Sequence, residues 1–206
     1  MKGKYIVIEG GEGAGKDTHI ERLKQEFGEE KFVYTREPGG TPLGKVLRGM
    51  LLHETEGPIA LPAEMFLFLA DRAQHVEKLI KPSLAAGKNV ISNRSWISFL
   101  AYQIHGREQY DWEQLVHSAL EKIIKDCQVD LAIILDVPYE VGHARMAKIG
   151  KELDIIERAV GGLHERVRNA FLDIAKTMPQ AKVIDASRGV DEVWKDVKAA
   201  VQSVLE

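Results

Sequence analysis

The sequence predicts an α/β fold built on a doubly wound, five-stranded parallel sheet with helices on both faces. Short apolar runs alternate along the chain with longer segments whose apolar residues recur at helical spacing. This alternation is typical of parallel strands that crossover helices bury on both sides. A chain of 206 residues can bury one substantial core. We therefore expect a single domain over residues 1–206.

The expected strands are five short apolar runs, each followed by glycine or by polar residues. They span residues 5–8, 32–34, 89–91, 131–135 and 182–184. In a parallel sheet the carboxyl ends of the strands meet along one edge, and ligands bind just beyond that edge. We therefore expect the functional residues directly after these runs.

The expected helices are the segments with helical periodicity that separate or follow the strands. Proline lacks an amide hydrogen, so Pro82 should bend or end the helix that contains it. The expected helices span residues 16–27, 43–52, 62–86, 111–125, 137–147, 156–177 and 190–204.

Residues 9–18 follow the first strand and have the layout of a phosphate-binding loop. Glycines let successive backbone amides curl around a polyphosphate, and the helix that follows presents its positive end. Lys16 would neutralise phosphate charge, and the alternative is a glycine-rich turn that binds nothing. The nucleotide-binding residues predicted here are Gly10, Gly11, Glu12, Gly13, Ala14, Gly15, Lys16, Asp17 and Thr18.

Composition and charge exclude several other classes of protein. A net charge of -3 and a pI near 6.2 disfavour a broad nucleic-acid surface, while a focal basic pocket is compatible with both. One cysteine, Cys127, excludes a disulfide framework, and we expect it to be buried and inert in a helical stretch. No apolar segment is long enough for a signal peptide or a membrane span. We expect a cytoplasmic protein without nucleic-acid or membrane partners.

Three arginines are candidates for a second anion site. Arg48 and Arg72 lie on expected helices, and Arg94 follows the third strand. Arginine suits this role because its planar guanidinium binds phosphate through two parallel hydrogen bonds. Surface arginines are usually solvated, so each arginine taken alone would more often be a surface residue, and the case for an anion site depends on their context.

Several motifs, in the same order, resemble those of the thymidylate kinase family, P-loop enzymes that phosphorylate dTMP with ATP. The resemblance covers most of the chain, and several moderately specific motifs in sequence are stronger evidence than any one. The similar blocks are residues 9–18, residues 36–41 with Leu47 and Arg48, residues 68–75, residues 93–107 and residues 135–138.

The resemblance implies a role for each matching residue. Lys16 would hold the donor phosphates, and Arg94 would bind the acceptor phosphate and the charge that develops during transfer; these two are the expected catalytic residues. Phe68 and Tyr102 could also be ordinary core aromatics. The expected acceptor-binding residues are Glu12 at the sugar 3′-hydroxyl, Arg48 and Arg94 at the phosphate, Phe68 on the thymine ring, Arg72 at its O4, Ser98 near the base and Tyr102 at the 2′ position.

The chain departs from the family at two positions near the expected Mg²⁺ ion. Asp17 replaces the usual Ser or Thr, and Asn93 replaces the usual Asp. One carboxylate is gained and one is lost, so we expect that the carboxylate has moved and that Asp17 is a metal ligand. The opposing interpretation is that Asp17 repels the donor phosphates and slows turnover.

Two further departures concern the base and the lid. Phe99 stands where the family usually has a small polar residue, and an apolar ring cannot hydrogen-bond thymine. The segment at about residues 146–156 resembles the family's mobile lid, with Lys148 and Lys151 where an arginine is usual. Arg145 or Arg158 could substitute, and the lysines could also be a solvated turn.

These observations predict a P-loop kinase architecture and a thymidylate kinase that uses ATP, dTMP and Mg²⁺. The resemblance also implies a homodimer. The alternatives are a kinase for another, 5-modified pyrimidine deoxynucleotide and a nucleotide-binding module with little turnover.

Overall fold

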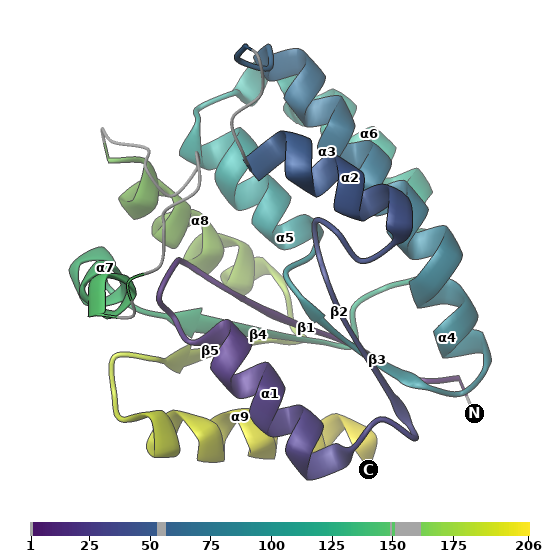
Figure 1. Ribbon diagram of the computed structural model, residues 1–206, viewed down its shortest axis with the longest axis vertical. Coiled ribbons are helices and arrows are strands. Elements are labelled where there is room, and N and C mark those ends of the chain that lie inside the picture. Colours follow the sequence, from purple (N-terminus) through teal and green to yellow (C-terminus); the bar gives the residue numbers. More distant parts are fainter. Residues whose placement is uncertain (1, 53–56, 149, 151–161) are drawn as a thin grey trace.

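The computed structural model describes residues 2–52, 57–148, 150 and 162–206. A five-stranded parallel sheet with strand order β2-β3-β1-β4-β5 runs through it, which confirms the predicted fold class (Figure 1). Every expected strand is present and extends further at its carboxyl end, toward the edge where functional residues were expected. The strands are β1 (Tyr5–Gly10), β2 (Phe32–Arg36), β3 (Asn89–Asn93), β4 (Leu131–Asp136) and β5 (Ala181–Asp185).

Helices cover both faces of the sheet, and alternate strand residues point to opposite faces. Ile6 and Ile8 pack with α1 (Lys16–Phe27) and α9 (Val190–Leu205). Val7 packs on the other face, beneath the remaining core helices (Figure 1). Those helices are α4 (Lys81–Ala85), α5 (Trp96–Phe99) and α8 (Leu163–Thr177), with π-helical segments η1 (Val76–Ile80) and η2 (Leu100–Gly106). Helix α3 (Leu61–His75) leads into η1.

Three helices form an outer group on that second face. The segment η3 (Tyr110–Trp112) leads into α6 (Glu113–Ile124), and α6 packs on α3. On the other side of α3 lies α2 (Pro42–Leu52) (Figure 1). No helix within the described ranges is long and apolar enough to cross a lipid bilayer.

The helix expected at residues 62–86 changes geometry one turn before Pro82. Residues Val76–Ile80 form a π-helical turn, and the chain then returns to α geometry through Pro82 until Ala85. Pro82 lies in the first turn of α4, where a missing amide hydrogen is tolerated. Cys127 is buried as expected, but it lies in the turn after α6 rather than in a helix, and burial raises the pKa of its thiol to about 11.

The helical segment at residues 96–106 was not predicted. Ser95 caps its first turn, because the Ser95 hydroxyl accepts a hydrogen bond from the Ile97 amide at 3.2 Å. Residues 97–104 are all buried. A helix buried all round lacks the polar stripe by which amphipathic helices are detected.

Helix α7 (Tyr139–Lys148) rests directly on the phosphate-binding loop. A Cβ atom at Gly13 would overlap the carbonyl oxygen of Gly142, and one at Gly142 would overlap the carbonyl oxygen of Glu12. Glycine at both positions lets the two backbones touch. Of the expected lid, residues 146–148 end α7, whereas residue 149 and residues 151–156, including Lys151, lie outside the described residues.

Candidate active site

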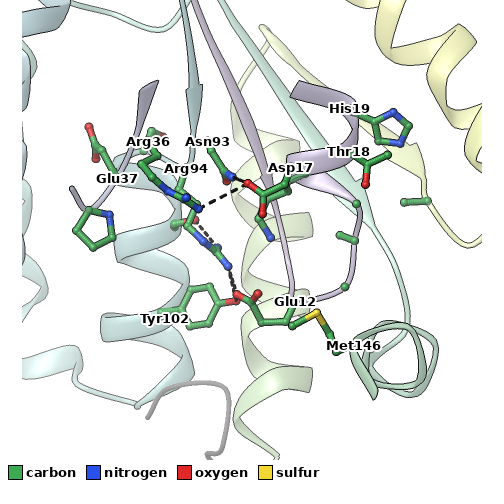
Figure 2. A pocket seen from close by; sticks show the side chains of 18 of the residues that line it. Glu12, Asp17, Thr18, His19, Arg36, Glu37, Asn93, Arg94, Tyr102 and Met146 are labelled. Atoms are coloured by element: carbon green, nitrogen blue, oxygen red, sulfur yellow. Dashed lines mark hydrogen bonds and ion pairs between the residues drawn. The ribbon is translucent and has the colours of Figure 1, made fainter. Parts of the chain in front are cut away.

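A cavity of about 570 Å³ opens at the carboxyl edge of the sheet. Its wall combines the phosphate-binding loop with the segments that follow β2, β3 and β5, as the parallel topology requires. Figure 2 shows Glu12 and Asp17, from the phosphate-binding loop and the start of α1, pointing toward Arg94 and Asn93 at the end of β3. Among the described residues, every predicted site residue except Gly10, Gly11 and Lys148 lines this cavity.

The phosphate-binding loop turns from β1 into α1 through glycines with positive φ. Gly10 has φ 135° and Gly15, the residue before the helix, has φ 90°. The Lys16 ammonium donates to the carbonyl oxygens of Gly10 at 3.0 Å and Gly11 at 2.7 Å. Burial, followed by the nearby Arg94 charge, lowers the pKa of Lys16 to about 8. This lysine therefore lies where an anion would stabilise its charge.

Arg94 lies at the centre of the cavity and contacts several parts of the site. One nitrogen, Nη1, donates to Ser98 Oγ at 2.9 Å and to the carbonyl oxygen of Gly10 at 3.2 Å. The other, Nη2, pairs with the Glu12 carboxylate and contacts the Tyr102 hydroxyl at 3.2 Å (Figure 2). The guanidinium also lies 4.9 Å from the Tyr102 ring centroid, within cation–π range.

Glu9 is a buried carboxylate beneath this group that sequence reasoning passed over. It is inaccessible to solvent and accepts hydrogen bonds from Ser95 Oγ at 2.7 Å and from Ser98 Oγ. Burial raises the pKa of Glu9, although both hydroxyls oppose this. Ser98 thus joins Glu9 to Arg94, so the residue predicted near the base also fixes the guanidinium. The feature of the sequence that could have identified Glu9 is a carboxylate within an apolar strand.

Asp17 and Asn93, the two unusual positions, are in direct contact. The Asn93 side-chain amide donates to Asp17 Oδ1 at 2.7 Å, and Arg36 Nη2 lies 3.6 Å from the same oxygen (Figure 2). The Asp17 side chain is 83% exposed, at the start of α1, where the helix dipole favours a carboxylate.

The three candidate arginines line one cavity, and each has different partners there. The Arg48 guanidinium donates to the carbonyl oxygen of Pro38 at 3.0 Å. Arg72 pairs with Glu37, and its grouping with Arg48 and Arg94 at a second anion stays a prediction. Glu37 contacts both Arg72 and His75. Neither Glu37 nor His75 was singled out from the sequence, although Glu37 directly follows a strand.

The apolar part of the cavity and its far end come from different elements. The Phe68 and Phe99 rings lie 6.0 Å apart on the side of Arg72. At the opposite end Arg145, from α7, donates to the carbonyl oxygens of Ala186 at 2.8 Å and Ser187 at 3.2 Å. Lys148 is exposed at the end of α7 and does not line the cavity, whereas Arg145 does.

The family of the chain follows from comparison with known proteins. A sequence model described as thymidylate kinase matches residues 8–197. Thymidylate kinase of Haemophilus ducreyi is 42% identical, over 100% of this chain and 96% of the relative. A crystal structure of thymidylate kinase from Ehrlichia chaffeensis superposes with a TM-score of 0.74 at 30% identity, covering 98% of this chain and 100% of that one.

A phosphate-binding loop between β1 and α1 of a parallel sheet, facing arginines across one cavity, defines a P-loop kinase. Within that class, the family match and the full-length relatives are decisive. The chain belongs to the thymidylate kinase family.

We predict that nucleoside triphosphate binding weakens as the pH rises above about 8. Because the pKa of Lys16 is lowered to about 8, the Lys16 ammonium group of the free protein loses a proton above that pH. Binding of the triphosphate then requires uptake of a proton by Lys16. By calorimetry, the Kd of a non-hydrolysable ATP analogue should rise by up to about tenfold per pH unit between pH 8 and 9.5. Lys16→Met should bind weakly with little pH dependence. A constant wild-type Kd over this range would contradict the assignment.

Proposed function

We propose that this chain acts as a thymidylate kinase, in one P-loop kinase domain, and transfers the γ-phosphoryl group of ATP to dTMP. The observation that carries the proposal is one cavity lined both by the phosphate-binding loop with Lys16 and by Arg48, Arg72 and Arg94. Family membership supports the same reaction.

The proposed donor site is the loop of residues 10–18. Its backbone amides and the start of α1 would bind the phosphates, with Lys16 exchanging its two carbonyl partners for phosphate oxygens. The proposed adenine end lies where Arg145 joins α7 to the segment after β5.

The proposed acceptor site is the wall formed by α2, α3 and the segment after β3. Arg48 and Arg94 would bind the acceptor phosphate, which would compete with Glu12 for Arg94. Once displaced, Glu12 would approach the sugar 3′-hydroxyl. Phe68 would stack on thymine, Arg72 would donate to its O4, and Tyr102 would exclude a 2′-hydroxyl.

The proposed chemistry is a direct transfer. An oxygen of the dTMP phosphate attacks the γ-phosphorus while the bond to the bridging oxygen of ADP breaks, so dTDP and ADP form without a covalent enzyme intermediate. Lys16 and Arg94 would bind oxygens whose charge grows in the transition state. Positioning and charge neutralisation therefore carry the catalysis.

The residues present fit a Mg²⁺ ion brought with ATP. The exposed Asp17 carboxylate and the neighbouring Thr18 hydroxyl are hard oxygen donors, as Mg²⁺ prefers. Within the described residues no cluster of three or more carboxylate, histidine or cysteine side chains could hold a metal. We propose that the ion is bound mainly through phosphates and water. Once bound, it would neutralise further negative charge on the transferring phosphoryl group.

The first test of this function is a panel of acceptors with ADP detection. We expect dTMP to be the best substrate among dTMP, dUMP, dCMP and 5-modified dUMP, while Lys16→Ala abolishes turnover without unfolding. A better 5-modified acceptor would select the alternative kinase. Tight ATP binding without ADP release would select the binding module, the alternative motivated by Asp17, Asn93 and the lysines Lys148 and Lys151.

The contact between Asp17 and Asn93 predicts strong coupling. Asn93→Asp alone places two carboxylates in contact, and Asp17→Ser alone removes the proposed metal ligand. Each single change should lower kcat/KM by about tenfold or more, and the double change should recover much of the loss. Mn²⁺ affinity with a non-hydrolysable ATP analogue, measured by electron paramagnetic resonance, should follow the same pattern. Additive effects in both measurements would contradict a shared metal site.

We also propose that the chain forms a homodimer through the outer faces of α2, α3 and α6. Val46 is 62% exposed, and further large apolar side chains on these three helices are exposed as well: Leu43, Met50, Phe66 and Leu115. A second copy would bury this surface. Val46→Glu should yield a monomer in sedimentation analysis, whereas Val183→Glu, on β5, should leave the dimer intact. A monomeric wild type would contradict the proposal.

A further inference from the structure

Arg72 is held on one edge by a buried carboxylate. Its Nε and Nη2 atoms donate to the same Glu37 oxygen, Oε2, at 2.9 and 2.7 Å, and both side chains are at most 5% exposed. Burial opposes charge on Glu37, but Arg72 and His75 outweigh that effect and hold its pKa below the usual value. The pair is therefore ionic, and the guanidinium has a fixed edge.

Glu37 is itself fixed from behind. Its other oxygen, Oε1, contacts His75 Nδ1 at 2.9 Å, and His75 Nε2 contacts the Thr35 hydroxyl at 2.7 Å. His75 is inaccessible to solvent, and a Cβ atom at Gly40 would overlap its ring. This chain of buried contacts leaves the Glu37 carboxylate little freedom to move.

Phe99 holds the face of the same guanidinium. The Arg72 Cζ atom lies 5.3 Å from the centroid of the Phe99 ring, within cation–π range, and Phe99 is 3% exposed. The Phe68 ring packs against Phe99, and both rings line the cavity. Edge and face together define one orientation of Arg72.

One donor of Arg72 remains for a ligand. Among the described residues, Nη1 is buried and has no hydrogen-bond partner, although Arg72 lines the cavity. Leaving a buried charged donor unpaired is costly, which favours a ligand that supplies an acceptor there. The arginine side chain only donates hydrogen bonds. Nη1 can therefore bind a carbonyl oxygen of a ligand but cannot bind an amino group.

We propose that Phe99 and Glu37 clamp Arg72 and thereby determine which base is accepted, with Phe99 as the specificity-determining residue. This rests on the proposed function and makes the substrate class pyrimidine deoxynucleotides with an oxygen at ring position 4. Neither Phe99 nor Phe68 can hydrogen-bond the base, so discrimination against a 4-amino pyrimidine depends on the orientation of Arg72.

The test compares the Kd values of dTMP and dCMP in three proteins, in the presence of a non-hydrolysable ATP analogue. Phe99→Leu keeps the site apolar but removes the aromatic face, and it should reduce the dCMP/dTMP ratio of Kd values by about tenfold. Phe99→Tyr keeps the ring and should preserve the ratio within about threefold. Affinity for the ATP analogue should be unchanged in both.

A merely structural role for Phe99 would weaken both acceptors equally and leave the ratio unchanged, and that result would overturn the proposal. Glu37→Gln should also lower the ratio, while the Phe99 variants keep the test decisive if that buried substitution prevents folding. Failure of the proposed function looks different, because the wild type would then neither bind nor phosphorylate dTMP. A wild type that phosphorylates dTMP but binds dCMP equally well would refute the clamp alone.

Discussion

The site depends on one constraint: cations gathered in a partly buried cavity must be countered by groups of the protein itself. The parallel sheet brings Lys16, Arg72 and Arg94 to one edge, where water screens their charges poorly. Each cation is countered differently. Lys16 contacts two loop carbonyl oxygens, Arg94 pairs with Glu12, and Arg72 pairs with Glu37.

These counter-groups differ in how readily they can be replaced. Glu12 is 24% exposed and belongs to the loop that would receive phosphates, so an anionic ligand can compete with it. Glu37 is 4% exposed and is held by His75, so its pairing with Arg72 is a permanent part of the fold. Lys16 and Arg94, the proposed phosphoryl-transfer residues, therefore have partners that a ligand can replace. Arg72, the proposed base-reading residue, has a fixed partner.

The sequence predicted the sheet, most helices and the cavity wall, because strand runs, glycine positions and helical periodicity are local signals. It did not predict the helix at residues 96–106, whose burial on all sides hides its period. It also missed the partners of the predicted residues. Nothing in the spacing of Glu37 and Arg72, which are 35 positions apart, indicates that they share two hydrogen bonds. Such pairings are set by tertiary packing and appear only in three dimensions.

The same reasoning explains how the family pattern can change at Asp17 and Asn93 without disturbing the charge of the site. The two side chains touch, so moving a carboxylate from one position to the other keeps one negative charge within the same contact. Retaining Asp at position 93 beside Asp17 would instead place two carboxylates in contact, which is strongly unfavourable unless one is protonated. We therefore propose that the two departures are one compensated change, in which Asn93 supplies a hydrogen bond where a second charge would repel.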